Sequence, residues 1–291
     1  MVGEFPELQG TMGRYYAEAD GEEHSVARAI EQHYKPRFAG DTLPEGDVSL
    51  ALALADKLET LAGMFGIGAQ PTGDKDPFAL RRHALGVVRM LVEGGLPLSL
   101  DLLVRDALGV FPAGLLQDAR VDLETFLYER LRAYLRDAGY SANEVESVLS
   151  MRPDRLDQVP KQLDAVRAFA GLAEAESLAA ANKRVVNILR QAEAKGELFA
   201  NAEPGLLVEP AEKALFEALG KASQLATPLF ASGDYTGYLK AFAVLKAPVD
   251  AFFDSVMVNA DDPAVRRNRL ALLAGLRREM NRVADLSKLA A

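Results

Sequence analysis

The sequence predicts an all-α protein. Apolar residues recur at helical spacing along most of the 291-residue chain. Glycine, proline, aspartate and asparagine stand at the joints between these stretches, where such residues start and stop helices. No run of residues alternates between apolar and polar strongly enough to predict a strand. We therefore expect a core made by helices packed on helices.

Five helices are expected in the first half of the chain. Asp76-Pro77 is the clearest start signal, because an aspartate can cap a helix whose first position is a proline. Gly139 is expected to stop one helix, and Ser141 or Asn143 to cap the next. The expected helices are 22–34, 48–65, 77–93, 122–138 and 143–151.

The second half is expected to form a bundle of about four helices. Their predicted ranges are 163–195, 209–225, 235–253 and 263–289. Between the halves, residues 151–160 (MRPDRLDQVP) place two prolines among charges, which is typical of a boundary. The chain length suits two domains with separate cores. We expect a first domain at 1–152, a linker at 153–162 and a helical domain at 163–291.

The composition is typical of a globular protein, with 49% hydrophobic and 26% charged residues. No apolar run approaches the roughly 20 residues that span a bilayer, so no membrane segment is expected. The absence of cysteine excludes a disulfide framework, a thiolate metal site and a thiol nucleophile. Nothing at the N-terminus resembles a signal peptide, and we expect a cytoplasmic location.

The net charge of −9 is unevenly distributed. Residues 160–291 hold 17 of the 33 Lys/Arg and 16 of the 42 Asp/Glu. The first 159 residues therefore hold 16 basic and 26 acidic residues, and all the excess negative charge lies there. Residues 263–291 contain seven basic and two acidic residues. Because salt screens charges beyond about 8 Å, a local basic face can attract phosphate on an acidic molecule.

Two predicted helices carry cations away from their apolar residues. On one, Lys183, Asn187 and Arg190 share a face. On the other, a basic stripe is expected, with Arg267, Arg278 and Arg282 opposite the apolar side and Arg266 and Arg277 on the flank. Planar guanidinium groups can line phosphates or stack on unpaired bases. From periodicity alone, a solvated face without a partner is the simpler interpretation of both helices. Arg269 differs, because it points to the apolar side and is expected to hold a buried carboxylate. The candidate residues are Lys183, Arg184, Asn187 and Arg190 on one helix, and Arg266, Arg267, Arg277, Arg278 and Arg282 on the other.

The glycine-rich segment 63–76 (GMFGIGAQPTGDKD) lacks the G-x-x-x-x-G-K-[ST] pattern, and we interpret it as a connector. At its exit, Lys75, Arg81 and Arg82 could meet a nucleic-acid backbone or a partner subunit. Arg81 and Arg82 cannot point the same way on a helix, so one of them can serve the structure instead.

No catalytic arrangement and no working metal site are expected. Asp56, with His24 and His33 before it in the sequence, is the candidate metal ligand, but the His-Asp doublet that such a centre needs is missing. His83 follows Arg82 on an apolar helix and is expected to be a packed or capping histidine.

Five long segments carry a specific sequence pattern: EFPELQGTMGRYYA (4–17), HYKPRFAGDTLP (33–44), 54–89, ANKRVVNILR (181–190) and FFDSVMVNADDPAVRRNRLALL (252–273). Together they resemble one family, the β subunits of the bacterial two-subunit glycyl-tRNA synthetase. The resemblance implies a helical domain of the HD type over 1–152, followed by an anticodon-binding bundle like that of arginyl- and cysteinyl-type synthetases. It covers the C-terminal part of such a subunit, so we expect a piece of a longer protein.

The resemblance implies recognition of tRNA(Gly) for ATP-dependent glycylation, with the candidate cations touching tRNA. In the family a separate α subunit uses ATP and Mg²⁺, so no catalytic centre, cofactor or metal is expected here. The expected partners are tRNA(Gly) and the α subunit in an α2β2 assembly, with no DNA and no membrane. Two alternatives stay open: a metal-dependent phosphohydrolase of the HD type, and a scaffold that only docks the α subunit. Five or six phosphate contacts predict that log K for tRNA binding falls with log salt concentration with a slope of roughly −4 to −5.

Overall fold

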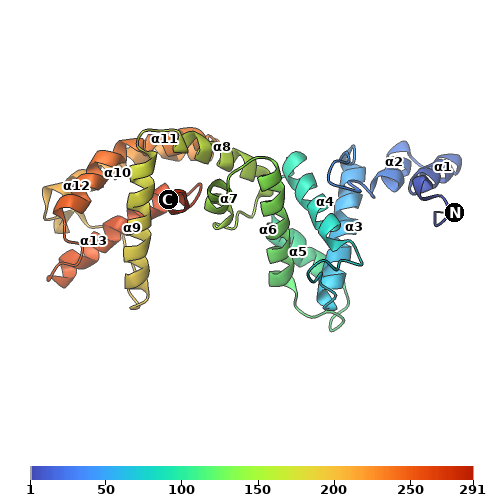
Figure 1. Ribbon diagram of the computed structural model, residues 1–291, viewed down its shortest axis with the longest axis horizontal. Helices are drawn as coiled ribbons and strands as arrows, with labels where there is room; N and C mark the ends of the chain where they lie inside the picture. Colours follow the sequence, from blue (N-terminus) through green and yellow to red (C-terminus); the bar gives the residue numbers. More distant parts are fainter. Residues whose placement is uncertain (1, 291) are drawn as a thin grey trace. The chain divides into compact units, whose positions relative to one another are not determined.

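The computed structural model describes residues 2–290, and within that range it contains helices and no strand (Figure 1). The predicted all-α class is therefore confirmed. The chain forms two compact units. The first comprises the described residues up to Ala138 together with Pro153–Val159. The second comprises Gly139–Arg152 and the described residues from Pro160 onward.

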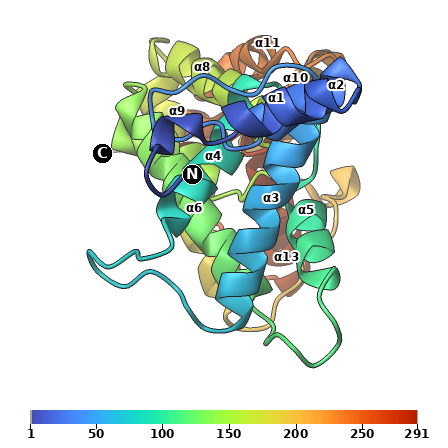
Figure 2. The same cartoon turned by 90° about the vertical axis from the view of Figure 1, so that its right-hand side faces the viewer.

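The first unit is built around three packed helices. α3 (Asp47–Gly66) packs against α4 (Leu80–Glu93), and α4 packs against α6 (Arg120–Asp137). Their apolar faces form the core, in which side chains such as Leu61 and Leu127 are 0% exposed. The connection between α3 and α4 extends away from the helices (Figure 2). The remaining elements are η1 (Pro6–Leu8), α1 (Thr11–Ala19), α2 (His24–Gln32), α5 (Leu100–Gly109) and η2 (Leu156–Gln158).

Two of these helices were not predicted. α1 and α5 are 9 and 10 residues long, so each offers fewer than three turns in which a period can show. α5 nevertheless has a local signal, because the Ser99 side chain accepts a hydrogen bond from the backbone N–H of Leu102.

The predicted start of α4 at Pro77 is wrong, because the helix begins at Leu80. Asp76 still caps it, since its carboxylate accepts the backbone N–H of Leu80 at 2.8 Å and of Arg81 at 3.0 Å. Ala79 lies between them with φ of 54°, in the left-handed region that a helix cannot include. The capping residue was identified correctly, but the register of the helix was not.

The second unit has more and shorter helices than predicted. The range 163–195 forms two helices, α8 (Val159–Ala170) and α9 (Ala175–Glu193), with a turn after Gly171. The range 235–253 likewise divides, because Pro248 lacks an N–H and its ring would clash with the carbonyl of residue 244 in a continuous helix. The unit also contains α7 (Ala142–Leu149), η3 (Pro204–Leu206), α10 (Pro210–Ala231), α11 (Tyr235–Ala241), η4 (Ala243–Leu245), α12 (Lys246–Ser255), α13 (Pro263–Met280) and η5 (Leu286–Leu289).

The last long helix, α13, ends at Met280 and does not reach residue 289 as predicted. Asn281 follows it and pairs its side-chain amide with that of Asn182, with N–O distances of 2.6 and 3.2 Å. The same Asn281 oxygen accepts the backbone N–H of Leu286 at 2.9 Å. The chain therefore turns here while Val283 and Leu286 stay buried.

Residues 139–152 belong to the second unit because α7 packs on η5. The Ser141 side chain and Glu144 form a capping box at the start of α7, which confirms one of the two predicted caps. The carbonyl oxygen of Ser147 accepts the backbone N–H of Asp285 at 2.7 Å. Arg167 of α8 pairs with Glu144 at 2.9 Å. Helix capping and these contacts hold the segment to the second unit.

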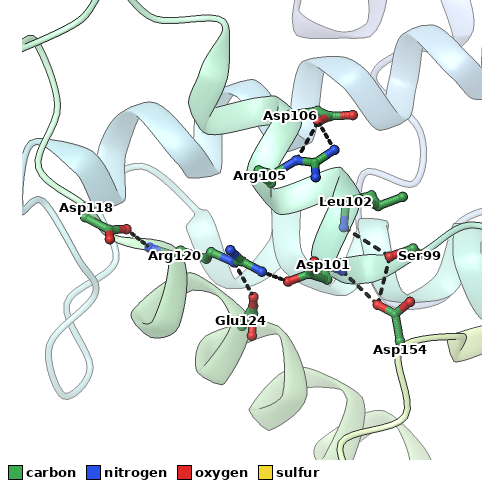
Figure 3. Close-up of polar contacts among 9 residues, drawn as sticks. All are labelled: Ser99, Asp101, Leu102, Arg105, Asp106, Asp118, Arg120, Glu124 and Asp154. Carbon is green, nitrogen blue, oxygen red and sulfur yellow. Dashed lines mark hydrogen bonds and ion pairs between the residues drawn. The ribbon is translucent and has the colours of Figure 1, made fainter.

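Residues 153–159 return to the first unit. Asp154 accepts hydrogen bonds from the Ser99 hydroxyl at 3.0 Å and the Asp101 backbone N–H at 2.9 Å, at the start of α5 (Figure 3). In the same view, Arg120 pairs with Asp101 and with Glu124. The predicted boundary at 152 and linker at 153–162 differ from this division. Pro153 and Pro160 indicate where the chain passes between the units, but they do not indicate to which unit the residues before and after them belong.

Candidate nucleic-acid interface

The exposed face of α9 carries the first group of candidate residues. Val185 and Leu189 are 0% exposed and fix the rotation of the helix against the core. As a result Lys183, Arg184, Asn187 and Arg190 are all exposed. The guanidinium of Arg184 lies 4.2 Å from the ring centre of Phe253, which holds it in a cation–π contact.

The second group, on and after α13, does not form the continuous basic stripe that was expected. Arg266 makes a bidentate ion pair with Glu197, with N–O distances of 2.7 and 2.8 Å. Arg277 pairs with Glu193 at 2.8 Å. The hydrogen bonds from Arg266 hold the pKa of Glu197 below its usual value. α9 packs on α13 (Figure 1). Glu193 at the end of α9 and Glu197 after it therefore lie beside α13 and neutralise both guanidinium groups.

The other three arginines of this group have different surroundings. Arg267 is exposed and has no hydrogen-bond or ion-pair partner within the described part of the chain. Arg278 is also exposed and lies 3.5 Å from its neighbour Glu279. Arg282 lies beyond the end of α13 and stacks on Phe230, with its guanidinium carbon 3.8 Å from the ring centre. It therefore does not share the helix face on which it was predicted.

Arg269 holds a buried carboxylate, as predicted. Its side chain is 8% exposed and pairs with Glu212 of α10, whose side chain is 0% exposed. It also donates to the carbonyl oxygen of Met257 at 2.7 Å. Arg269 thus ties α13 to α10 and to the segment after α12, and it is not available to a ligand.

A groove of about 310 Å³ lies between α9, α13 and the segment 256–259. We call it the α9–α13 groove. Two of the candidate residues, Arg184 and Arg266, line it. Lys195 and Gln191 add a cation and an amide from the α9 side. The remaining lining is Ile188, Ala192, Val256, Met257, Val258, Asn259 and Leu270.

This mixture of side chains suits a nucleotide. Arg184 and Lys195 can attract phosphate, while Gln191 and Asn259 can donate to and accept from a base edge. Met257, which is 74% exposed, offers apolar surface for an unstacked base. The sequence interpretation missed Gln191, Lys195, Met257 and Asn259. Met257 and Asn259 lie in the segment 252–273, and Gln191 and Lys195 directly follow the segment 181–190, but periodicity does not predict which loop faces which helix.

In the first unit, the structure separates the three predicted contact residues. Arg81 donates to the carbonyl oxygen of Gly73 and closes the loop before α4, so it is the structural member of the arginine pair. Lys75 is exposed within that loop, where its backbone pairs with Thr72. Arg82 is exposed and has no hydrogen-bond or ion-pair partner among residues 2–290.

The residues around Asp56 do not assemble as a metal centre would need. His24 has a side chain that is 76% exposed. His33 stacks on Tyr34 and places its Nδ1 2.9 Å from the carbonyl oxygen of Ile30. Over the part of the chain that the structure describes, no three His, Cys, Asp or Glu residues are grouped so that they could hold an ion.

Comparisons with known proteins assign separate sequence profiles to the two halves of the chain. The sequence profile of the family described as glycyl-tRNA synthetase beta subunit matches residues 1–150. The profile of the DALR anticodon binding domain matches residues 178–289, which include the whole α9–α13 groove. None of the helices in the described range is both long and apolar enough to cross a bilayer.

Similar proteins include three described as glycine–tRNA ligase beta subunits. The chain is 65% identical over 291 residues to that of Thiobacillus denitrificans, covering 100% of this chain and 41% of the relative. Against Paracidovorax citrulli it is 63% identical over 290 residues, covering 100% and 40%. Against Methylobacillus flagellatus it is 59% identical over 292 residues, covering 100% and 41%. The chain thus spans about two fifths of the length of these relatives.

Proposed function

Since this chain belongs to the glycyl-tRNA synthetase beta subunit family, we propose that it forms part of the tRNA-binding surface of such a ligase. The second unit contacts the anticodon end of tRNA(Gly) through the α9–α13 groove and the exposed face of α9. In this proposal the groove holds an unpaired nucleotide, and the neighbouring cations of α9 bind the phosphates on either side of it.

The observation that carries this proposal is the coincidence of chemistry and position. The groove combines Arg184 and Lys195 with two amide side chains and an apolar wall, all inside the range that the anticodon-binding profile matches. The alternative of a solvated helix face without a partner does not account for the groove beside α9. The alternative of a surface that binds only phosphates does not account for the amide side chains of Gln191 and Asn259 in the groove.

Ion pairing changes the expected energetics of binding. Arg266 and Arg277 already have carboxylate partners, so they release few counterions when tRNA binds. Three exposed cations on and beside α9, Arg184, Arg190 and Lys195, have no carboxylate partner among the described residues. About three phosphate contacts give a slope of roughly −2 to −3 in log K against log salt, shallower than the −4 to −5 expected from the sequence.

The test is a salt titration of tRNA(Gly) binding to the full chain. The double variant Arg184→Ala, Lys195→Ala should weaken binding at least about tenfold in low salt, because it removes two charge-assisted contacts. Its slope should be less steep by roughly 1.5, or about 0.7–0.9 for each lost contact. Filter binding and anticodon footprinting measure both effects.

Lys221→Ala is the matched control, because Lys221 is an exposed cation of the same unit on α10, outside the groove. It should leave the slope and the anticodon footprint unchanged. Equal loss in the control and the double variant would mean that any cation of this unit contributes, and the groove assignment would be abandoned. Binding unchanged in both would favour a scaffold that docks a partner subunit without touching RNA.

The finer expectations belong to the same proposal. Glycine activation with ATP and Mg²⁺ takes place on a separate α subunit, in an α2β2 assembly in the cytoplasm, and this chain supplies no catalytic group. The first unit adopts a helical arrangement of the HD type without its metal chemistry. Metal analysis of the purified chain, with a phosphodiester hydrolysis assay, tests the last point: bound metal with turnover would favour the phosphohydrolase alternative.

A further inference from the structure

The first unit contains a small polar pocket that the proposed tRNA contacts do not use. It measures about 240 Å³ and lies between α3, the start of α4 and the segment 34–37. We call it the Lys57 pocket. Lys57 and Asp56 of α3, Arg82 and His83 of α4, and Tyr34 and Arg37 line it.

Lys57 is the unusual member of this pocket. The residue is 3% exposed, yet it forms no ion pair with any residue of the described range. Its Nζ donates one hydrogen bond, to the carbonyl oxygen of His33 at 3.0 Å. An ammonium has three donors, so two have no partner here. Burial lowers the pKa of Lys57, and the charge of Asp56 acts in the opposite direction.

The backbone holds Lys57 in this position. A Cβ added at Gly86 would lie 2.9 Å from Cε of Lys57, so the glycine leaves room for the lysine stem to cross α4. Any larger residue at 86 would displace the side chain. The buried lysine stem therefore packs against Gly86 on its way to the pocket.

Two further donors converge on the same space. Nδ1 of His83 is buried and has no hydrogen-bond partner within the described part of the chain. Burial, and then the charge of Lys57, lower the pKa of His83, so its ring is neutral near pH 7. Arg82 is exposed and has no hydrogen-bond or ion-pair partner among the described residues, which leaves its guanidinium available.

The charges around the pocket favour an anion. The lining contributes three cations, Arg37, Lys57 and Arg82, against one carboxylate, Asp56. Asp41 pairs with Arg37 at 3.0 Å and neutralises it. Three positive against two negative groups leaves one net positive charge, in a chain whose net charge is −9. A local excess of this sign, with donors that lack partners, points to a ligand that accepts hydrogen bonds.

We propose that the Lys57 pocket binds a phosphate group, with Lys57 and Arg82 supplying charge and His83 and Tyr34 supplying further donors. A phosphate offers three or four acceptor oxygens to these donors, whereas a carboxylate offers two. The phosphate can belong to an RNA strand or to a small phosphorylated molecule. Both sources present the same chemistry to the pocket.

The experiment measures inorganic phosphate binding to the full chain by ³¹P line broadening and by titration calorimetry. Lys57→Met and Arg82→Ala should each weaken binding at least about tenfold, because each removes a charge-assisted contact. Arg82 is exposed, so the second variant keeps the test decisive even if the first destabilises the fold. Arg105→Ala, an exposed arginine that pairs with Asp106 outside the pocket, is the matched control and should bind normally.

A 5′-phosphorylated oligoribonucleotide and its dephosphorylated form distinguish the sources. Tighter binding of the phosphorylated form alone assigns an RNA terminus to the pocket. Equal binding of the two forms, with inorganic phosphate still competing for the pocket, assigns a small anion. The double variant Arg184→Ala, Lys195→Ala should keep the phosphate affinity of the Lys57 pocket, because both residues lie in the other unit. The two proposals can therefore fail independently. If neither pocket variant weakens phosphate binding, or the wild-type chain binds none, the proposal is overturned.

Discussion

Lys57 in the first unit and Arg269 in the second are both buried cations within helices, 3% and 7% exposed. Arg269 has a buried carboxylate, Glu212, and a backbone carbonyl as partners. Lys57 has one carbonyl and a pocket. The comparison shows that burial alone does not indicate a role for a charged side chain. A cation paired with a buried carboxylate serves the fold, whereas one with unused donors at a pocket is available to a ligand.

The largest expected effect comes from breaking the Arg269 pair. Glu212→Ala should lower the free energy of unfolding by about 3–5 kcal/mol, because it leaves the Arg269 guanidinium buried without its carboxylate. Urea denaturation measures the change. Glu217→Ala, an exposed glutamate on the same helix, is the control and should change stability by less than about 0.5 kcal/mol. A small loss for Glu212→Ala would mean that the two buried cations do not differ as described.

A second ion pair, Glu144 with Arg167, is less buried than Arg269 with Glu212 and tests how much burial contributes. Their side chains are 13% and 51% exposed. The hydrogen bond from Arg167 lowers the pKa of Glu144 to about 2, below its usual 4.5. Because the folded value is the lower one, the stabilisation is complete above pH 4.5 and is lost as the pH falls towards 2.

The variant Glu144→Gln should therefore remove about 1–2 kcal/mol at neutral pH, after allowance for the exposed arginine, and almost nothing near pH 2. Glutamine can keep the capping box with Ser141, so the change isolates the charge. Denaturation from pH 2 to 7 measures it. Glu176→Gln, an exposed glutamate of the same unit, should not alter the acid dependence. A difference from wild type that persists at pH 2 would show that the charge is not its cause.

Lys57→Met should change stability by less than about 1 kcal/mol. Methionine keeps the length of the side chain, and losing one hydrogen bond is offset by removing the cost of a buried charge. Arg269→Met, in contrast, should cost several kcal/mol, because Glu212 would remain buried without a cation. Urea denaturation of both variants at equal pH compares the sites directly. Equal losses would make Lys57 a structural residue and weaken the pocket proposal.

The smallest expected effect concerns tRNA binding by paired and unpaired arginines. Arg277→Ala should leave the salt slope nearly unchanged, because Glu193 already neutralises this guanidinium. Arg190→Ala should make the slope less steep by about 0.7–0.9, because Arg190 is exposed on α9 and has no carboxylate partner among residues 2–290. The same salt titration measures both. Equal changes would show that the ion pair opens when tRNA binds.

Local sequence features predicted much of this structure. Periodicity gave the helical class, the exposed face of α9 and the inward direction of Arg269, because each depends on residues one or two turns apart. The caps at Asp76 and Ser141 follow from side chains that bond to their own backbone.

The remaining features depend on residues far apart in the chain. Glu197, which follows α9, and Arg266 of α13 are 69 positions apart, so the local sequence around either residue could not predict their pairing. The Lys57 pocket likewise needs α3, α4 and the segment 34–37 in place, and His83 was expected to be merely packed. The end of α13 depends on an amide pair between Asn182 and Asn281, which lie 99 positions apart.

The alternation of segments 139–152 and 153–159 between the units limits how this chain can be divided by genetic engineering. A gene fragment ending at residue 152 would lose Asp154 and with it three hydrogen bonds at the start of α5. The complementary fragment would lack α7, one of the two helices on which η5 packs. Expression of either unit alone would need a transplanted copy of the missing segment, and a recombination event at the family-profile limit of residue 150 would damage both products.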